Sequence, residues 1–139
     1  MQGIHVADHL NQKIRRINSE SFTSTIAGTG ALGNQNGAGA TASFNYPYAL
    51  CFDNTTGDLF VSDNGVVRRI TLAGVVSNFA TIGGFQAGIV VDNSSNIYVA
   101  NVQLQRGTYM HFMLYHRMDI KSTYSHSVLT KGVFLHYLT

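Results

Sequence analysis

Residues 46–63 read YPYALCFDNTTGDLFVSD, and this stretch decides the fold of the chain. Two short apolar runs, 49–52 and 59–61, flank a polar segment rich in Asp, Asn, Thr and Gly. Apolar and aromatic strand formers on both sides of such a segment are typical of a β-hairpin. The stretch therefore predicts two antiparallel strands joined by a turn at residues 53–58.

The hairpin pattern recurs further along the chain. Residues 88–101 repeat it, with Asp92 in the place of Asp53 and Val99 in the place of Val61, so the two copies are offset by 39 and 38 residues. A hairpin repeated at a period of about 40 residues indicates a β-propeller blade.

A third, partial copy lies near the N-terminus. Residues 6–8 match 61–63 and 99–101, and the strand Ile-Arg-Arg-Ile at 14–17 matches Val-Arg-Arg-Ile at 67–70. A loop with five glycines, 28–41, accounts for most of the longer offset between these copies. We expect three strands over residues 4–27, four over 49–80 and two over 88–101, with polar turns between them.

The repeated residues resemble the NHL repeat, whose blades carry a Val-Ala-Asp…Asn…Arg-Ile…Ile pattern. Residues 6–17, VADHLNQKIRRI, carry most of this likeness, and residues 24–30 and 44–53 are similar to the outer strand and to the lead-in of the next blade. The resemblance implies four-stranded blades in a closed ring that serves as a binding platform. We therefore expect an all-β, incomplete NHL-type β-propeller over residues 4–101, about two and a half blades, whose structural repeat positions are Asp8, Arg15, Asp53, Asp63, Arg68 and Asp92.

The second unit departs from the repeat pattern at one point. Its segment 63–68, DNGVVR, is two residues shorter than its counterpart in the first unit, which predicts a tighter turn. After Asn101 the repeat is lost, and residues 102–139 hold four of the six His but only two of the 14 Gly. We interpret 102–139 as a divergent tail, less ordered than 4–101 or folded in a way unrelated to a blade.

Composition sets limits on the class of protein. The 139 residues are 45% hydrophobic and 12% charged, which suits one ordered domain, and the net charge of +2 gives no argument for nucleic acid or membrane binding. The single cysteine, Cys51, allows no internal disulfide and lies in an apolar run, which predicts an inert, buried thiol. We identify neither a signal peptide nor an apolar run long enough to span a membrane, and the compartment stays open.

No catalytic constellation is identified, and we expect no cofactor. Residues 28–33 read G-x-G-x-x-G and Asp53 follows, but the next residues cannot form the helix that a dinucleotide site requires. The His residues match no compact metal-ligand spacing. The alternative is part of a six-bladed propeller enzyme, such as a metal-dependent lyase or a lactonase. The predicted inner strands, 49–52 and 87–91, contain neither His nor acidic residues, which disfavours it.

The pairs Arg15–Arg16 and Arg68–Arg69 suggest a second alternative, an RNA-binding propeller face. Successive side chains of a strand point to opposite faces, so only one member of each pair faces a given side. We favour an ion pair between one Arg of each pair and the preceding Asp8 or Asp63.

The favoured function is a non-catalytic binding or scaffolding module, a piece of a larger protein with a protein partner. Because strand residues are chiefly apolar, recognition falls to loops, and the longest loop, 28–41, holds the candidate binding residues Asn34, Gln35 and Asn36. Too few blades to close a ring leave open strand edges, which predicts self-association.

Overall fold

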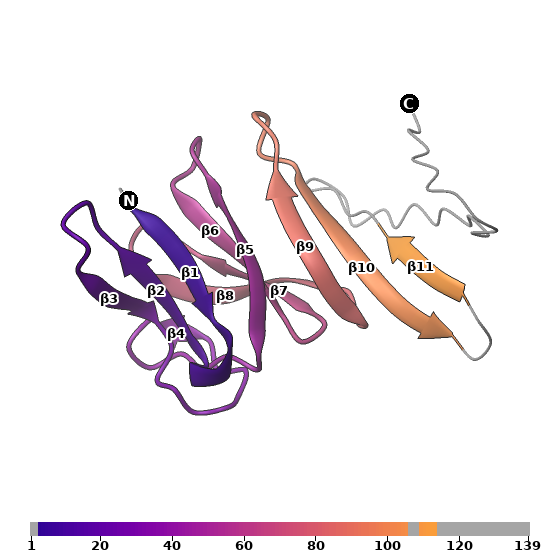
Figure 1. The fold of residues 1–139 in the computed structure, drawn as a ribbon, viewed down its shortest axis with the longest axis horizontal. Helices are drawn as coiled ribbons and strands as arrows, with labels where there is room; N and C mark the ends of the chain where they lie inside the picture. Colours follow the sequence, from indigo (N-terminus) through magenta and orange to yellow (C-terminus); the bar gives the residue numbers. More distant parts are fainter. Residues whose placement is uncertain (1–2, 106–108, 114–139) are drawn as a thin grey trace.

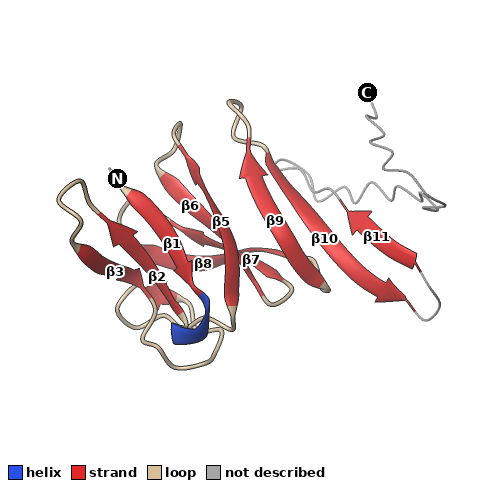
Figure 2. Ribbon diagram, viewed as in Figure 1, coloured by secondary structure: helices blue, strands red, loops and turns tan. Residues whose placement is uncertain are grey.

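The structure, a computed structural model, describes residues 3–105 and 109–113 of the chain (Figure 1). In this part, strands form three antiparallel sheets that stand side by side, joined by loops and one short 3-10 helix (Figure 2). The predicted all-β class is confirmed. The three sheets do not close into a ring within the described residues.

The first sheet contains the three strands expected near the N-terminus, β1 (Ile4–Asp8), β2 (Lys13–Ile17) and β3 (Thr23–Ala27). Strand β1 pairs with β2 from Ile4↔Ile17 to Asp8↔Lys13. The segment between them was expected to be only a polar turn. Instead it forms the 3-10 helix His9–Asn11. Gln12, whose backbone is left-handed, follows the last helical residue.

The second sheet is built on the stretch that decided the fold. Its strands, in the spatial order β4-β8-β7-β6-β5, are β4 (Gly37–Ala38), β5 (Pro47–Asp53), β6 (Asp58–Asp63), β7 (Val66–Ile70) and β8 (Val75–Thr81). The predicted hairpin is confirmed, because β5 and β6 pair from Asp53↔Asp58 outward. Its turn forms because the Asp53 carboxylate accepts hydrogen bonds from the Thr55 N–H and the Thr56 hydroxyl, each at 2.9 Å.

The tighter turn of the second unit is also confirmed. Asn64 and Gly65 alone connect β6 to β7, and both adopt positive φ, at 43° and 86°. Two-residue hairpin turns of this kind need left-handed backbone at both positions, and Asn-Gly supplies it.

The third sheet contains the second copy of the hairpin, β9 (Phe85–Val91) and β10 (Ile97–Gln105), which pair from Ile97↔Val91. Asp92 begins the turn as Asp53 does, accepting the N–H groups of Ser94 at 2.9 Å and Asn96 at 2.8 Å. Strand β10 runs past the predicted boundary at residue 101, and β11 (Tyr109–Met113) adds a third strand beyond the two expected. Residues 114–139 lie outside the described part, so the domain division stays a prediction.

The side chains of the second sheet are buried on both of its faces, because alternate residues of a strand point to opposite sides. On one side Leu59 and Val61 pack with Ile14 and Ala27 of the first sheet. On the other side Phe60 packs with residues of the third sheet, among them Ile89, Ile97 and Val99. The second sheet therefore carries two cores, one shared with each neighbour.

The glycine loop, expected to contain no strand, contains a short one. Strand β4 lies within it and pairs with β8 at Gly37↔Val76 and Ala38↔Val75. At Gly39 a Cβ atom would lie 2.5 Å from the Ile26 carbonyl oxygen, so only glycine allows this close backbone approach. Composition alone did not predict the strand because two residues carry no apolar periodicity.

Candidate binding pocket

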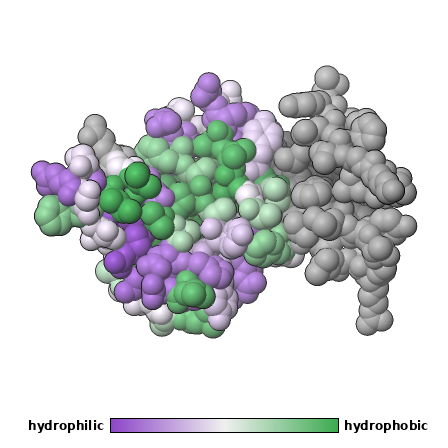
Figure 3. Space-filling model, in the orientation of Figure 1, coloured by the Kyte–Doolittle hydropathy of each residue, from purple (hydrophilic) through white to green (hydrophobic). Residues whose placement is uncertain are grey.

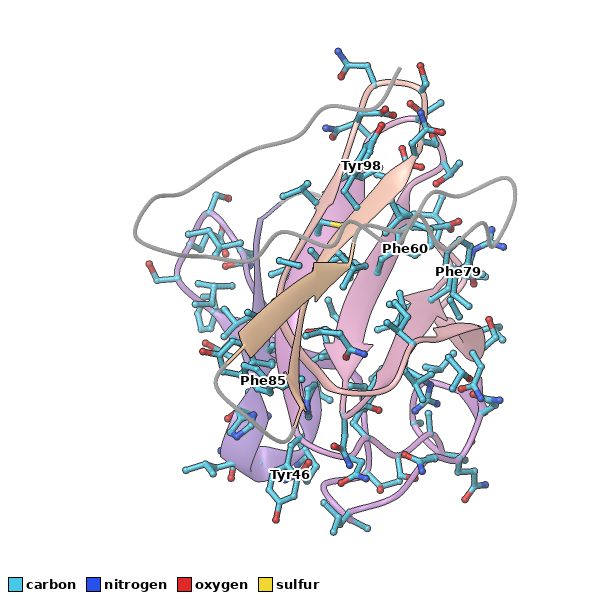
Figure 4. All side chains as sticks on the ribbon, turned by 90° about the vertical axis from the view of Figure 1, so that its right-hand side faces the viewer. Tyr46, Phe60, Phe79, Phe85 and Tyr98 are labelled. Atoms are coloured by element: carbon cyan, nitrogen blue, oxygen red, sulfur yellow. The ribbon has the colours of Figure 1, made fainter. Side chains whose placement is uncertain are left out.

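An aromatic cluster lies at one end of the three sheets. The rings of His9 and Tyr46 are 5.4 Å apart, His9 and Tyr48 are 5.9 Å apart, and Tyr48 meets Phe85 edge-on at 4.8 Å. Tyr46, Tyr48 and Phe85 remain about half exposed, at 45%, 50% and 50%. In Figure 4 Tyr46 and Phe85 lie toward one end of the strands, and Tyr98 lies toward the opposite end. Exposed aromatic rings that touch one another in this way form a stacking surface.

Backbone irregularities set the direction of these rings. The pairing of β5 with β6 shifts between Pro47 and Leu50, so that Tyr48 and Ala49 lie opposite the single residue Ser62. The pairing of β9 with β10 shifts at the same end, between Ala100 and Asn101. Such β-bulges redirect side chains and are frequent beside functional sites. Both hairpins therefore use a bulge at the end where the aromatic cluster forms.

Tyr46 is held in an unusual conformation. Its φ of 62° lies in the left-handed region, which is uncommon for a bulky side chain. Two contacts across the sheets fix the segment: the Tyr46 N–H donates to Gln12 Oε1 at 2.7 Å, and His9 Nδ1 lies 3.2 Å from the Pro47 carbonyl oxygen. A strained residue that is over-determined by its neighbours is a reason to suspect function.

A small pocket opens beside the aromatic cluster, with a volume of about 50 Å³. Its walls come from all three sheets and their connections, and the lining residues are His9, Tyr46, Tyr48, Ser62, Asn64, Phe85 and Gln86. The Ser62 hydroxyl already has partners, since it accepts a hydrogen bond from the Ala49 N–H at 2.9 Å and donates one to the Ala49 carbonyl at 3.3 Å. We name this feature, the pocket with its aromatic rim, the aromatic pocket.

Gln86 supplies the pocket with a hydrogen-bond donor that is not in use. Its Oε1 accepts the Gly65 N–H at 3.3 Å, which fixes the orientation of the amide because an N–H needs an acceptor. The residue is only 2% exposed, and its Nε2 has no partner among the described side chains. A buried amide donor without a partner costs free energy. A ligand acceptor that bonded this donor would recover that cost as binding free energy.

The chemistry of the aromatic pocket is that of an uncharged ligand. None of its lining residues is Asp, Glu, Lys or Arg. The volume accommodates a few water-sized groups and not a whole drug-sized molecule. The pocket would therefore hold one uncharged, acceptor-bearing end of a ligand whose remainder stacks on the exposed rings.

The candidate binding residues of the glycine loop lie elsewhere, and part of their polar groups is engaged. Arg68 Nη2 donates to the Gln35 carbonyl at 3.1 Å and to Asn36 Oδ1 at 2.8 Å, and Arg68 Nη1 donates to the Ser43 carbonyl at 3.1 Å. Residues 34–36 are nevertheless exposed as a whole. Their role in binding stays a prediction, and none of them lines the aromatic pocket.

Four of the six structural repeat positions form two Asp–Arg ion pairs. The ion pair Arg68–Asp63 is completely buried at 3.0 Å, while the matching pair Arg15–Asp8 is partly exposed at 4.0 Å. The Arg68 guanidinium also lies 5.2 Å from the centre of the Phe44 ring. The neighbouring Arg69 pairs with Asp58 at 2.6 Å. One arginine of each pair, Arg15 or Arg68, therefore pairs with the preceding aspartate, as expected.

The hairpin aspartates and the cysteine have shifted acidities. Burial by itself would raise the pKa of Asp53, but hydrogen bonds from Ser95, Thr55 and Thr56 outweigh it and hold that pKa below its usual value. Burial, with the Asp53 charge nearby, raises the pKa of Cys51 to about 12. The expectation of an inert thiol agrees with this shift, although Cys51 is half-buried and not fully enclosed.

Within the described residues, no three His, Cys, Asp or Glu side chains gather as a potential metal site. The tail residues His116, His126 and His136 lie outside that part. No helix in the described ranges is long and apolar enough to cross a membrane.

Sequence reasoning missed the aromatic pocket, although one signal was present. Tyr46 and Phe85 each precede the turn aspartate of their hairpin, Asp53 or Asp92, by seven residues. An aromatic at the same position of each hairpin repeat indicates a shared surface. His9 comes from another segment, and Gln86 has no counterpart in the first hairpin, where Pro47 follows Tyr46, so neither carries such a signal.

No family model matches the chain, and no curated protein does. It is similar to a solved protein of unknown function from Bacteroides thetaiotaomicron, with a TM-score of 0.64 and 17% identity over 70% of this chain. It is also similar to an auxiliary nutrient binding protein from Bacteroides ovatus (TM-score 0.52, 15% identity, 68% of this chain) and to one from B. thetaiotaomicron (0.50, 18%, 66%). The matched part covers only 29%, 31% and 31% of those chains. These likenesses show a shared sheet-rich fold.

Proposed function

We propose that the chain is part of an NHL-type β-propeller that acts as a non-catalytic binding module of a larger protein and takes an uncharged ligand at the aromatic pocket. The observation that carries the proposal is the buried, unused donor of Gln86 in a pocket that three half-exposed aromatic rings also line. The solved neighbours named as nutrient binding proteins support a binding role.

Three features support the propeller. The repeat has a period of about 40 residues, the three sheets are antiparallel and adjacent, and the inner strands β5 and β9 lie side by side (Figure 1). The chain spans under a third of the length of the solved neighbours, so further blades would come from the remainder of a longer protein.

The alternative of an RNA-binding face is less well supported by the Arg68–Arg69 pair than by its sequence alone. Arg68 is fully buried, and Arg69 is committed to Asp58, so neither presents a free guanidinium to a phosphate. The inner strands supply no catalytic pair, and we propose no reaction.

The test uses saturation-transfer NMR with a panel of uncharged probes: monosaccharides, nucleosides and N-acetyl amino-acid amides. We expect at least one class to bind, and binding to fall about tenfold or more in Tyr48→Ala, since stacking on an aromatic ring and loss of a buried donor are each worth ~1–3 kcal/mol. Gln86→Met tests the donor separately. Phe22→Ala is the matched control, because Phe22 is 69% exposed and does not line the pocket. Equal loss in Phe22→Ala, or no class sensitive to Tyr48, would refute the pocket.

Self-association is the second part of the proposal. Strands β1 and β3 form the edges of the first sheet, and β4 and β5 form those of the second. Unpaired strand edges template association with other chains. Light scattering of the isolated chain should show oligomers, whereas a monodisperse monomer that melts cooperatively would contradict this.

A further inference from the structure

The turns of the two repeated hairpins carry the same short pattern. Residues 54–56 read Asn-Thr-Thr and residues 93–95 read Asn-Ser-Ser, and each triplet directly follows the turn aspartate, Asp53 or Asp92. An Asn followed two residues later by Ser or Thr, with no proline between them, is the acceptor pattern for N-linked glycans. No other asparagine of the sequence has Ser or Thr at that distance, and the two acceptors are 39 residues apart, which is the offset of the repeat.

Both acceptor asparagines lie at the surface, in the turn that joins the strands of a hairpin. Asn54 and Asn93 are exposed. The β5–β6 turn and the β9–β10 turn project from the same end of their sheets (Figure 1), and Figure 3 shows hydrophilic residues at both tips. A glycan is bulky and hydrated, so it requires a surface position of this kind.

The turns do not use the side chains of these asparagines. In each turn the aspartate carboxylate accepts the N–H of the residue two positions later, Thr55 or Ser94, at 2.9 Å, and this bond sets the turn. The side-chain amides of Asn54 and Asn93 have no hydrogen-bond partner among the described residues. The recurrence of asparagine at this position is therefore not explained by the stability of the turn.

The hydroxyl groups of the two patterns are enclosed once the turns have formed. The Thr56 hydroxyl donates to Asp53 Oδ2 at 2.9 Å, and Ser95 is only 2% exposed. An enzyme that reads the pattern must contact this hydroxyl as well as the amide. Transfer of a glycan therefore precedes closure of each hairpin. The amide still faces solvent afterwards, so the folded turn accommodates the glycan without rearrangement.

We propose that Asn54 and Asn93 are N-glycosylation sites and that the protein matures in a secretory compartment. The substrate class is an oligosaccharide joined to a lipid through a diphosphate. The asparagine Nδ2 forms a bond to the anomeric carbon of the first sugar, and the bond between that carbon and the phosphate oxygen breaks. The lipid diphosphate leaves, and the amide nitrogen gives one proton to a base of the transferase.

The two glycans would occupy the end of the sheets that lies opposite the aromatic pocket. Tyr98 donates its hydroxyl to Asp92 Oδ2 of the third-sheet turn at 3.1 Å, and Figure 4 places Tyr98 at the opposite end from Tyr46 and Phe85. Glycans at the turns therefore leave the pocket accessible. This inference is independent of the proposed function, because it concerns a covalent modification of the turns and not a ligand.

The test uses the protein isolated from the cells that produce it. Treatment with a peptide N-glycosidase in water labelled with heavy oxygen converts a glycosylated asparagine to a labelled aspartate, which peptide mass spectrometry locates. We expect the label at Asn54 and Asn93. Asn11 and Asn34 are the matched controls, because both are exposed and neither has Ser or Thr two residues later. Absence of the label from Asn54 and Asn93, or equal label at the controls, would overturn the inference.

Substitutions expressed in the same cells assign each glycan to its site. Asn54→Gln changes an exposed side chain without a partner, so it should leave the fold intact and remove one of two mobility shifts on an electrophoresis gel. Thr56→Ser keeps the hydroxyl and should retain both shifts, whereas Thr56→Ala should lose the same shift as Asn54→Gln. Unchanged mobility of Asn54→Gln, or the same loss in the control Asn34→Gln, would contradict the assignment.

Discussion

The first and second sheets carry the same Arg and Asp at the same repeat positions, yet the two ion pairs have different environments. Arg68 and Asp63 meet at 3.0 Å with side chains that are 1% exposed, whereas Arg15 and Asp8 are 4.0 Å apart and about 30% exposed. The difference comes from residues 35–45, which cover only the second pair. The repeat motif therefore supplies the pair, and the segment that precedes the unit determines whether it is buried.

The largest effect should follow replacement of the buried arginine. Arg68→Met leaves Asp63 buried and unpaired and releases the carbonyls of the glycine loop, so we expect a loss of about 3–5 kcal/mol in the free energy of unfolding. Arg15→Met should cost at most about 1 kcal/mol, as for exposed pairs. Urea denaturation of both variants measures this, and similar losses would remove the distinction between the two pairs.

A smaller effect is expected for the turn aspartates of the two hairpins. Asp53→Asn should cost about 1 kcal/mol at neutral pH, since it weakens hydrogen bonds to a buried charge. Because its pKa is lowered in the folded protein, this contribution is present above the unfolded pKa of about 4 and is lost as pH falls further.

The gap between Asp53→Asn and the unmodified chain should therefore close as the pH falls below about 4. Asp92→Asn, whose carboxylate makes the same type of turn on the third sheet, should have the smaller effect at neutral pH because Asp92 is less buried than Asp53. Melting temperatures across this pH range test both statements. A gap that widens in acid would contradict the assignment.

The smallest effect concerns the glycine loop. Asn36 accepts a hydrogen bond from the buried Arg68, and Asn11 donates one to the partly exposed Asp8, both at 2.8 Å. Asn36→Ala should cost about 1 kcal/mol and Asn11→Ala a few tenths. Thermal unfolding distinguishes them. If Asn36→Ala were neutral, the loop would not contribute to fixing Arg68.

The sequence predicted what is encoded locally. Alternating apolar residues around Asp53 and Asp92 specify two hairpins, and the Asn64-Gly65 pair specifies the tight turn, because each depends on neighbours within a few residues. The pairing of Arg68 with Asp63 was also accessible, since the repeat places them on adjacent strands.

Other features depend on residues distant in sequence. The burial of Arg68 depends on the Gln35 and Ser43 carbonyls, and the aromatic pocket joins His9 to Gln86 across all three sheets. Backbone carbonyls have no sequence signature, and a pocket between sheets has no periodicity. The sequence did not predict β4 for a similar reason. This strand has only two residues in a glycine-rich segment, and only its pairing with β8 identifies it as a strand.

The comparison is tested most directly by two double-mutant cycles, one on Arg68 and Asp63 and one on Arg15 and Asp8. Each cycle combines Arg→Met with Asp→Asn and measures the interaction energy from urea denaturation. We predict a coupling of about 2–3 kcal/mol for the buried pair and about 0.5 kcal/mol or less for the exposed pair. Equal couplings in the two cycles would contradict the claim that the segment before each unit, and not the repeat motif itself, determines the strength of the pair.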